Sequence, residues 1–124
     1  MKKEDFERWL EKYLRSQEQH MPEVIKELFS ENGVYWWGPF NEARYEIESI
    51  YQHHKNALSH QEDIKYSYEI LATTNKYGIA KFHLTLNDLT PNEPNTYEGI
   101  FLVYLNNSNK CTLFQEWYNS ITQK

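Results

Sequence analysis

Two ionisable residues in apolar surroundings are the part of this sequence that could carry out chemistry. His54 falls on the apolar stripe of a helix expected over residues 45–58, and Glu116 shares a strand face with Phe114 and Tyr118. A carboxylate on an apolar wall is costly unless it is paired or protonated, and a histidine is a natural partner. If His54 and Glu116 meet, the pair could orient and charge an imidazole for acid/base work near neutral pH.

Each of these two residues also has a purely structural interpretation. His54 could be a core histidine whose ring is satisfied by backbone groups or by a glutamate. Glu116 would face solvent if the strand register slipped by one residue, because a slip moves every side chain to the other face. Both interpretations stay open at the level of the sequence.

The five histidines do not have the spacing of a metal site. His53 and His54 are adjacent on the expected helix and diverge by about 100°, which does not suit one metal ion. The sequence also has no Gly-rich phosphate loop, no serine elbow and no Cys–His signature. We therefore expect neither a metal nor a cofactor.

The composition restricts the class of protein. The chain has 124 residues, of which 40% are hydrophobic and 16% are Phe, Tyr or Trp, which is enough for one domain over 1–124 with a real core. A net charge of −5 disfavours nucleic acid and an anionic membrane surface as partners, since phosphate binding needs a basic footprint. The single Cys111 forms no intramolecular disulfide, and we find neither a signal core nor a membrane-spanning run. We expect a cytoplasmic protein.

Helical periodicity predicts three helices in the first half of the chain. The first covers residues 4–18, the second begins at Pro22 and ends at Asn32-Gly33, and the third covers 45–58. Each has an apolar stripe, made of Phe6, Trp9, Leu10, Tyr13 and Leu14 in the first, Val24, Ile25, Leu28 and Phe29 in the second, and Ile47, Ile50, Tyr51, His54 and Leu58 in the third.

Strands are expected after the second helix and throughout the second half. A short strand over Val34–Trp37 places the adjacent Trp36 and Trp37 on opposite faces. After Asp63 the hydrophobic period changes from 3.6 to 2, which predicts a meander of four antiparallel strands. Their expected ranges are 64–73, 79–86, 97–105 and 110–118, with a surface loop over 88–96.

The last two of these strands are apolar on both faces. In the final strand, Cys111, Leu113 and Trp117 oppose Phe114 and Tyr118. Strands of this kind are usually covered on both sides, and the three helices can cover only one. We therefore predict a homodimer through the outer face of the sheet.

The order of elements is α+β, and at this point the residues resemble a known family. The segments Trp9–Tyr13, Leu28–Tyr35, Pro39-Phe40, Ile50-Tyr51 and Cys111–Trp117 are similar to the nuclear transport factor 2-like superfamily, in particular its SnoaL-like and ketosteroid-isomerase-like bacterial branch. The resemblance spans nearly the whole chain. It implies a cone-shaped half-barrel in which three N-terminal helices pack in a curved, mainly antiparallel sheet, with a deep and mostly apolar cavity at the open end.

The resemblance also implies roles for single residues. Tyr13 lies 16 positions before Phe29, where ketosteroid-isomerase-like proteins place an oxyanion-stabilising tyrosine. The two carboxylates of that chemistry would fall at Trp37 and near Phe101, and both positions are aromatic here. Without a base at the substrate carbon, Tyr13 alone cannot move a proton through an enolate, so steroid isomerisation is disfavoured.

Two hypotheses follow from these observations. The first is a protein that binds a small apolar or cyclic molecule, with His54 and Glu116 as acid and base and Tyr13 as hydrogen-bond donor, in an isomerase, cyclase or dehydratase type of reaction. The alternative is a non-catalytic dimeric interaction module whose aromatic residues fill the cone. The expected cavity lining is Tyr13, Phe29, Trp37, His54, Phe101, Phe114, Glu116 and Tyr118.

Overall fold

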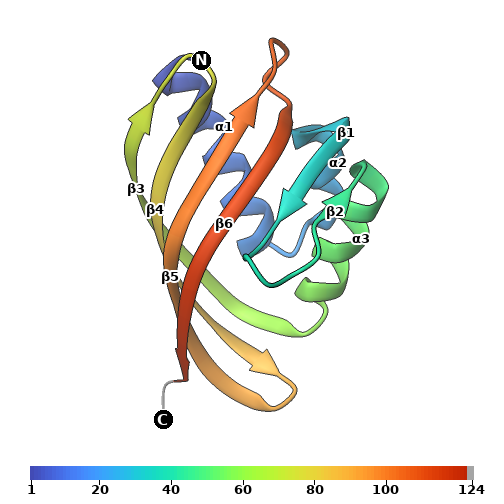
Figure 1. The fold of residues 1–124 in the computed structure, drawn as a ribbon. Helices are drawn as coiled ribbons and strands as arrows, with labels where there is room; N and C mark the ends of the chain where they lie inside the picture. Colours follow the sequence, from blue (N-terminus) through green and yellow to red (C-terminus); the bar gives the residue numbers. More distant parts are fainter. Residues whose placement is uncertain (123–124) are drawn as a thin grey trace.

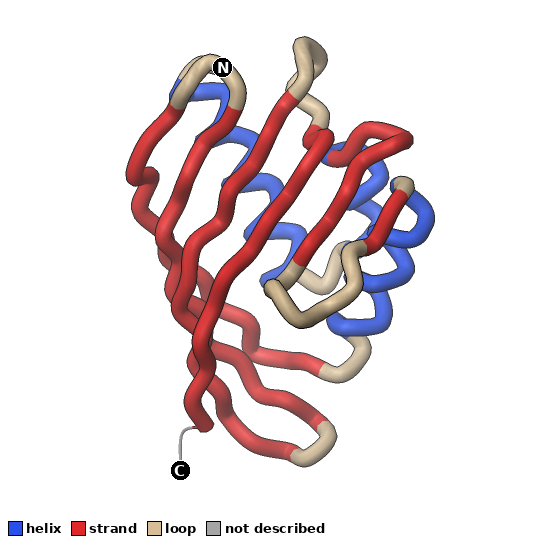
Figure 2. The backbone as a smooth tube through the Cα atoms, viewed as in Figure 1, coloured by secondary structure: helices blue, strands red, loops and turns tan. Residues whose placement is uncertain are grey.

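A long helix lies against the concave face of a strongly curved sheet (Figures 1 and 2). The computed structural model describes residues 1–122. Its helices are α1 (Lys3–Glu18), the short 3₁₀ turn η1 (Pro22–Val24), α2 (Ile25–Leu28) and α3 (Ile47–Leu58). Its strands are β1 (Phe29–Trp36), β2 (Arg44–Tyr45), β3 (Gln61–Thr73), β4 (Tyr77–Leu89), β5 (Asn92–Leu105) and β6 (Cys111–Thr122). Within residues 1–122, each helix is too short or too polar to cross a membrane.

The six strands form one mixed sheet in the order β2-β1-β6-β5-β4-β3. Strands β1 and β6 are parallel, and the other neighbours are antiparallel. The four long strands β3 to β6 curl past the ends of α1 and α3, so the helices cover part of the concave face and leave its lower end open (Figure 1). The predicted α+β class, with three helices in a curved, mainly antiparallel sheet, is confirmed.

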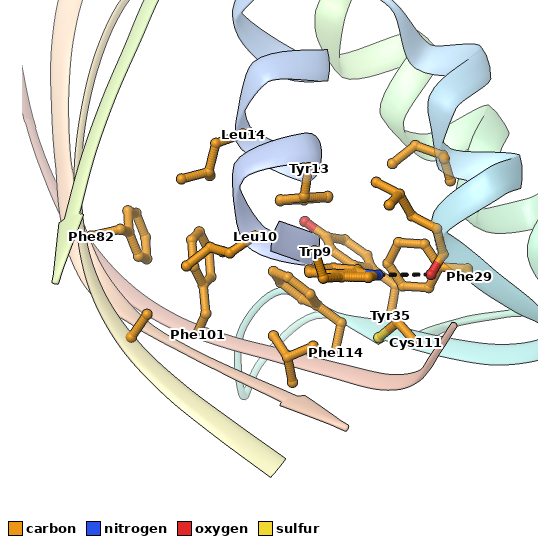
Figure 3. Close-up of a cluster of buried hydrophobic side chains, with 14 of the residues drawn as sticks. Trp9, Leu10, Tyr13, Leu14, Phe29, Tyr35, Phe82, Phe101, Cys111 and Phe114 are labelled. Atoms are coloured by element: carbon orange, nitrogen blue, oxygen red, sulfur yellow. Dashed lines mark hydrogen bonds between the residues drawn. The ribbon is translucent and has the colours of Figure 1, made fainter. Parts of the chain in front are cut away.

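The core is a stack of aromatic rings between α1 and the sheet (Figure 3). The indole of Trp9 stacks on Tyr13 with ring centroids 5.3 Å apart, and its Nε1–H donates to the Leu28 carbonyl at 2.9 Å. Phe101 and Phe114 of the sheet pack beneath Tyr13. The predicted stripe of the first helix is buried along its whole length. Offset aromatic pairs of this kind each contribute about 0.5–1.5 kcal/mol beyond area burial.

The second helix is shorter than predicted. It consists of one 3₁₀ turn and one α turn, and the chain is already extended from Phe29, so the expectation that Asn32-Gly33 ends the helix is wrong. Gly33 instead lies inside β1, where the register against β6 shifts between Phe29 and Val34. A Cβ at Gly33 would lie 3.1 Å from the Cys111 carbonyl oxygen, which explains why glycine suits this close approach of two strands.

Strand pairing also extends the meander beyond its predicted ends. Residues expected as a loop over 88–96 mostly belong to β4 and β5, whose ladder continues as far as the pair Leu89 and Asn92. A side-chain cluster holds this hairpin, because the Asp88 carboxylate accepts hydrogen bonds from both Asn95 and Tyr97. The chain before the third helix also forms β2, so that helix begins at Ile47.

The predicted orientation of Cys111 is wrong. A register irregularity between Tyr104 and Leu105 shifts the start of β6, and Cys111 is buried in the core together with Phe114. Beyond this point the strand alternates as expected. Glu116 and Tyr118 lie on the face of Phe114, and Trp117 lies on the outer face, where it contacts Trp36.

Candidate functional site

A cavity of about 240 Å³ lies at the open end of the sheet, between α1, α3 and the curled ends of β3 to β6. Five of the predicted residues line it, namely Tyr13, Trp37, His54, Glu116 and Tyr118. The remaining lining residues are Gln17, Tyr35, His53, Ala57, Gln61, Tyr66, Leu84, Leu86 and Tyr97. Hydroxyl, amide and imidazole groups therefore share the wall with apolar carbon, and the wall is more polar than the family resemblance implied.

Three of the predicted lining residues lie elsewhere. Phe29, Phe101 and Phe114 are each 1% exposed or less and belong to the core beneath the cavity. They face the same side of the sheet as Glu116, but α1 covers them with Trp9 and Tyr13. They support the cavity floor and do not line it.

His54 is held in one tautomer by two hydrogen bonds. Its Nδ1 lies 2.8 Å from the Ile50 carbonyl oxygen, which can only accept, so Nδ1 carries the proton. The bare Nε2 lies 2.8 Å from the Tyr13 hydroxyl oxygen and accepts a hydrogen bond from it. Burial lowers the pKa of His54 to about 3. The ring is thus neutral near pH 7, and the expectation of an imidazole that charges near neutral pH is wrong.

Glu116 is held by a residue of the neighbouring strand. Tyr35 stands opposite Phe114 in the parallel pairing of β1 and β6, so Glu116 is its diagonal neighbour on the same face. The Tyr35 hydroxyl donates to Glu116 Oε1 at 3.1 Å. Burial raises the pKa of the Glu116 carboxyl to about 7, although the bond from Tyr35 favours the ionised form. Near neutral pH both protonation states of this carboxyl are therefore populated.

His54 and Glu116 do not form the direct pair expected from the sequence. Two tyrosines stand between them, with Tyr13 hydrogen-bonded to His54 and Tyr35 hydrogen-bonded to Glu116. When Glu116 is ionised, the single hydroxyl proton of Tyr35 points to the carboxylate. When Glu116 is protonated, the carboxyl can donate to Tyr35, whose proton is then free for Tyr13 or for a ligand. In both protonation states of Glu116, the Tyr13 hydroxyl keeps its proton and donates it in the hydrogen bond to His54 Nε2.

The entrance to the cavity is aromatic. The Trp37 ring lies 4.3 Å from the His53 ring and 5.9 Å from the Tyr35 ring, measured between centroids. Burial, with a smaller effect of Arg44, lowers the pKa of His53 to about 4. Trp36 points to the opposite sheet face and contacts Trp117, as the strand alternation predicted for the two tryptophans.

Comparison with solved structures identifies the architecture. The chain superposes on the epoxide hydrolase/cyclase-like enzyme SalBIII, which has a role in pyran ring formation in the polyether salinomycin, with a TM-score of 0.82, 10% identity and coverage of 94% of this chain and 95% of that one. It also superposes on a ketosteroid isomerase-like protein from Erwinia carotovora atroseptica SCRI1043, with a TM-score of 0.70, 14% identity and coverage of 90% and 92%.

The chain has the nuclear transport factor 2-like fold. This confirms the fold that the sequence resemblance implied. The likeness is one of structure, since no family model and no curated protein matches the sequence.

Within this nuclear transport factor 2-like cone, the two positions compared with ketosteroid-isomerase carboxylates differ in environment. Trp37 lines the entrance of the cavity, whereas Phe101 is buried in the core and stacks on Phe82 with centroids 4.1 Å apart. The carboxyl group that does reach the cavity is Glu116, on β6. In the described part of the chain, no three His, Cys, Asp or Glu side chains gather in a way that could hold a metal ion.

Sequence reasoning missed the tyrosines that complete the wall of this cone. Tyr35, in β1, lies two residues before Trp37 in extended chain and so shares its face, a signal that was present in the sequence. Tyr66 and Tyr97 come from β3 and β5, and burial raises the pKa of both hydroxyls, that of Tyr97 to about 12. All three therefore remain protonated hydrogen-bond donors near neutral pH.

Proposed function

We propose that this chain binds a small cyclic molecule in its cavity and transfers a proton through the carboxyl group of Glu116. The observation that carries the proposal is the 3.1 Å bond between Tyr35 and Glu116 on the cavity wall. A carboxyl whose pKa is raised to about 7 can give or take a proton near neutral pH with little driving-force penalty, which is the property of an efficient general acid or base.

The two tyrosines take different parts in this proposal. The Tyr13 hydroxyl already donates its one hydrogen bond to His54, so it cannot also donate to a ligand oxygen. Tyr35 gains a free proton when Glu116 is protonated, and it then becomes the donor to a ligand carbonyl, hydroxyl or epoxide oxygen. His54 acts as a positioning residue that fixes the Tyr13 hydroxyl. Catalysis by His54 as a charged acid, which the sequence suggested, is not part of this proposal.

The volume restricts the ligand. Sites for drug-sized molecules occupy about 300–1,000 Å³, and the cavity here is about 240 Å³. A compound with one ring, or two small rings, therefore fits better than a steroid. The two structural neighbours are described as an epoxide hydrolase/cyclase-like enzyme and a ketosteroid isomerase-like protein, and both descriptions are compatible with acid/base chemistry on a ring. We therefore assign the reaction to the isomerase, cyclase or dehydratase type.

The experiment follows proton exchange, which needs no knowledge of the product. Single-ring ketones and enones, such as cyclohexanone and cyclohex-2-enone, are incubated with protein in D₂O, and loss of the α-proton signal is recorded by NMR. Cyclohexene oxide provides a separate arm for ring opening. We expect acceleration by the native chain and a loss of about 10²- to 10⁴-fold in Glu116→Gln, the usual contribution of a general acid or base.

The matched control is Glu31→Gln, which changes an exposed carboxylate on β1. This variant should exchange protons at the native rate. If Glu116→Gln and Glu31→Gln both keep the native rate, or if the native chain does not accelerate exchange or ring opening, the proposed chemistry is wrong.

A dimeric interaction module is the second candidate, and an exposed apolar stripe favours it. Ile100 and Trp117 are cross-strand partners on the outer face and are 40% and 39% exposed. Trp36 packs edge-on against Trp117, and Leu102 and Leu113 continue the stripe on neighbouring positions. We propose that a second copy of the chain covers this stripe. A dimer formed through this stripe would leave the cavity accessible, since the stripe and the cavity lie on opposite faces of the sheet.

A further inference from the structure

A cation stands on the cavity face of the sheet edge. Arg44 lies on the short strand β2 and is the direct cross-strand partner of Tyr35 on β1. Paired residues of an antiparallel ladder project to the same face, so the Arg44 side chain shares the face of Tyr35. Tyr35 and Trp37 line the cavity, and Arg44, which is not itself a lining residue, stands at the cavity edge against the Trp37 ring.

The guanidinium of Arg44 contacts the Trp37 ring and not a carboxylate. Its central carbon lies 5.0 Å from the centroid of the Trp37 ring, within the range of a cation–π contact. Among residues 1–122, Arg44 takes part in none of the ion pairs, although Glu42 and Glu46 lie two positions away on either side. The contact with Trp37 orients the side chain and leaves its N–H donors available.

The entrance also has a surface for a flat ring. Trp37 contacts the His53 ring on α3 as well as Arg44, and Trp37 and His53 both line the cavity. His53 is neutral near pH 7, so Arg44 is the charge that meets a ligand here. Further inside, Glu116 is the ionisable carboxyl group, and it would repel a second anion placed next to it.

We infer that the ligand of this cavity carries a carboxylate on its ring, and that Arg44 binds this carboxylate at the entrance while the opposite end of the ring reaches Tyr35 and Glu116. A guanidinium presents paired N–H donors that match the two oxygens of a carboxylate. The arrangement also fixes the orientation of the ligand. Its carboxylate stays at the cavity entrance beside Arg44, and an uncharged oxygen at the opposite end of the ring enters the cavity. This inference rests on the proposed function, since it assigns the ligand class of the same cavity.

The test compares two probes of the same shape, benzoate and benzamide, by isothermal titration calorimetry or ligand-observed NMR at low salt and neutral pH. The native chain should bind benzoate about two- to fivefold more tightly than benzamide, the range of a partly exposed ion pair with good geometry. Arg44→Gln should abolish this preference and leave benzamide binding unchanged. Arg44→Lys keeps the charge without the planar fork and should retain part of the preference.

The matched control is Arg15→Gln, which removes an exposed arginine of α1 that is not among the cavity-lining residues. It should keep the native preference, and the melting temperature of each variant verifies that it is folded. An equal affinity of the native chain for the two probes, or an unchanged preference in Arg44→Gln, overturns the assignment of the anion site.

Failure to bind either probe at millimolar concentration also overturns the assignment. The proton-exchange assay on uncharged ketones judges the proposed function separately from this result, because those compounds make no demand on Arg44.

Discussion

Tyr35 and Glu116 are 81 residues apart in the chain, and they meet because β1 and β6 lie side by side in the sheet. The parallel pairing puts Tyr35 opposite Phe114, and the two-residue period of the strand then brings Glu116 to the same face one step further along. The hydroxyl reaches the carboxylate at 3.1 Å. Two rigid strands therefore hold the donor and the acceptor, and no loop is involved.

The buried carboxyl of Glu116 should make stability depend on pH. Its pKa is raised from 4.5 to about 7, so folding favours the protonated form. The contribution of this group is fully present below about pH 4.5 and is lost as pH rises through about 7. At about 1.4 kcal/mol per pKa unit, the rise from 4.5 to about 7 corresponds to about 3.4 kcal/mol, which is an upper limit because the group is partly solvated.

Urea unfolding of the native chain and of Glu116→Gln across this pH range measures the effect. The unfolding free energy of the native chain should decrease between about pH 5 and about pH 8. That of Glu116→Gln should not show this decrease, because its amide does not ionise. Glu31→Gln should keep the native pH dependence. Parallel curves for the native chain and Glu116→Gln would show that the Glu116 carboxyl is not perturbed.

Local patterns explain which parts of the fold were predictable. The stripe of Phe6, Trp9, Leu10, Tyr13 and Leu14 specifies one helical face without reference to the rest of the chain, and α1 has nearly the predicted bounds. The two-residue strand β2 has no such pattern. It exists because Arg44 and Tyr45 find partners on β1, and a pairing of this kind is not visible in a short stretch of sequence.

In the candidate site, too, some residues could be predicted from local sequence patterns and others depend on strand pairing. Periodicity placed His54 on a buried helix face and Glu116 on one strand face with Tyr118, and the family resemblance put that strand face on the cavity side. Both His54 and Glu116 line the cavity. Their partners depend on the register of β1 against β6, which includes an irregularity between Phe29 and Val34. Tyr35 was therefore not predicted as the partner of Glu116, since a one-residue change in this register would have turned it away.

Removal of the Tyr35 hydroxyl should affect Glu116 directly. In Tyr35→Phe the carboxylate loses a hydrogen bond that favours its ionised form, so the pKa of Glu116 should rise further. The unfolding free energy at neutral pH should fall by about 1 kcal/mol, the net value of a typical hydrogen bond. Carbon-13 NMR of the glutamate carboxyl groups, recorded as a pH titration, measures the pKa.

The control for this variant is Tyr45→Phe, which removes a hydroxyl from a tyrosine that is 65% exposed on the adjacent strand. It should leave the Glu116 titration unchanged. A Tyr35→Phe variant whose Glu116 carboxyl titrates at the native pH would contradict the bond seen between the two side chains.

The His54 ring should stay neutral with its proton on Nδ1. Nitrogen-15 NMR of the imidazole should show this single tautomer from about pH 8 down to about pH 4, because the pKa of His54 is lowered to about 3. A lowered histidine pKa contributes stability above the unfolded value of 6.5, and this contribution is lost as pH falls toward 3. Observation of the Nε2–H tautomer would contradict the bond from Tyr13.

The same hydrogen bond predicts the effect of Tyr13→Phe. This variant leaves the buried Nε2 acceptor of His54 without its donor, which should reduce the unfolding free energy by about 1–3 kcal/mol. Chemical denaturation at neutral pH measures the change. Tyr45→Phe again provides the control, and it should be as stable as the native chain within about 0.5 kcal/mol.

The outer sheet stripe should hold two chains together. Sedimentation equilibrium of the native chain at micromolar concentration should give twice the mass of one chain, because Ile100, Trp117 and their neighbours present an apolar surface that a second copy can cover. Trp117→Glu places a charge in the middle of this stripe and should give the mass of a single chain. Tyr45→Glu changes an exposed aromatic residue on the edge strand and should remain dimeric. A single-chain mass for the native protein would contradict the dimer, whereas a dimeric Trp117→Glu variant would place the interface on a different surface.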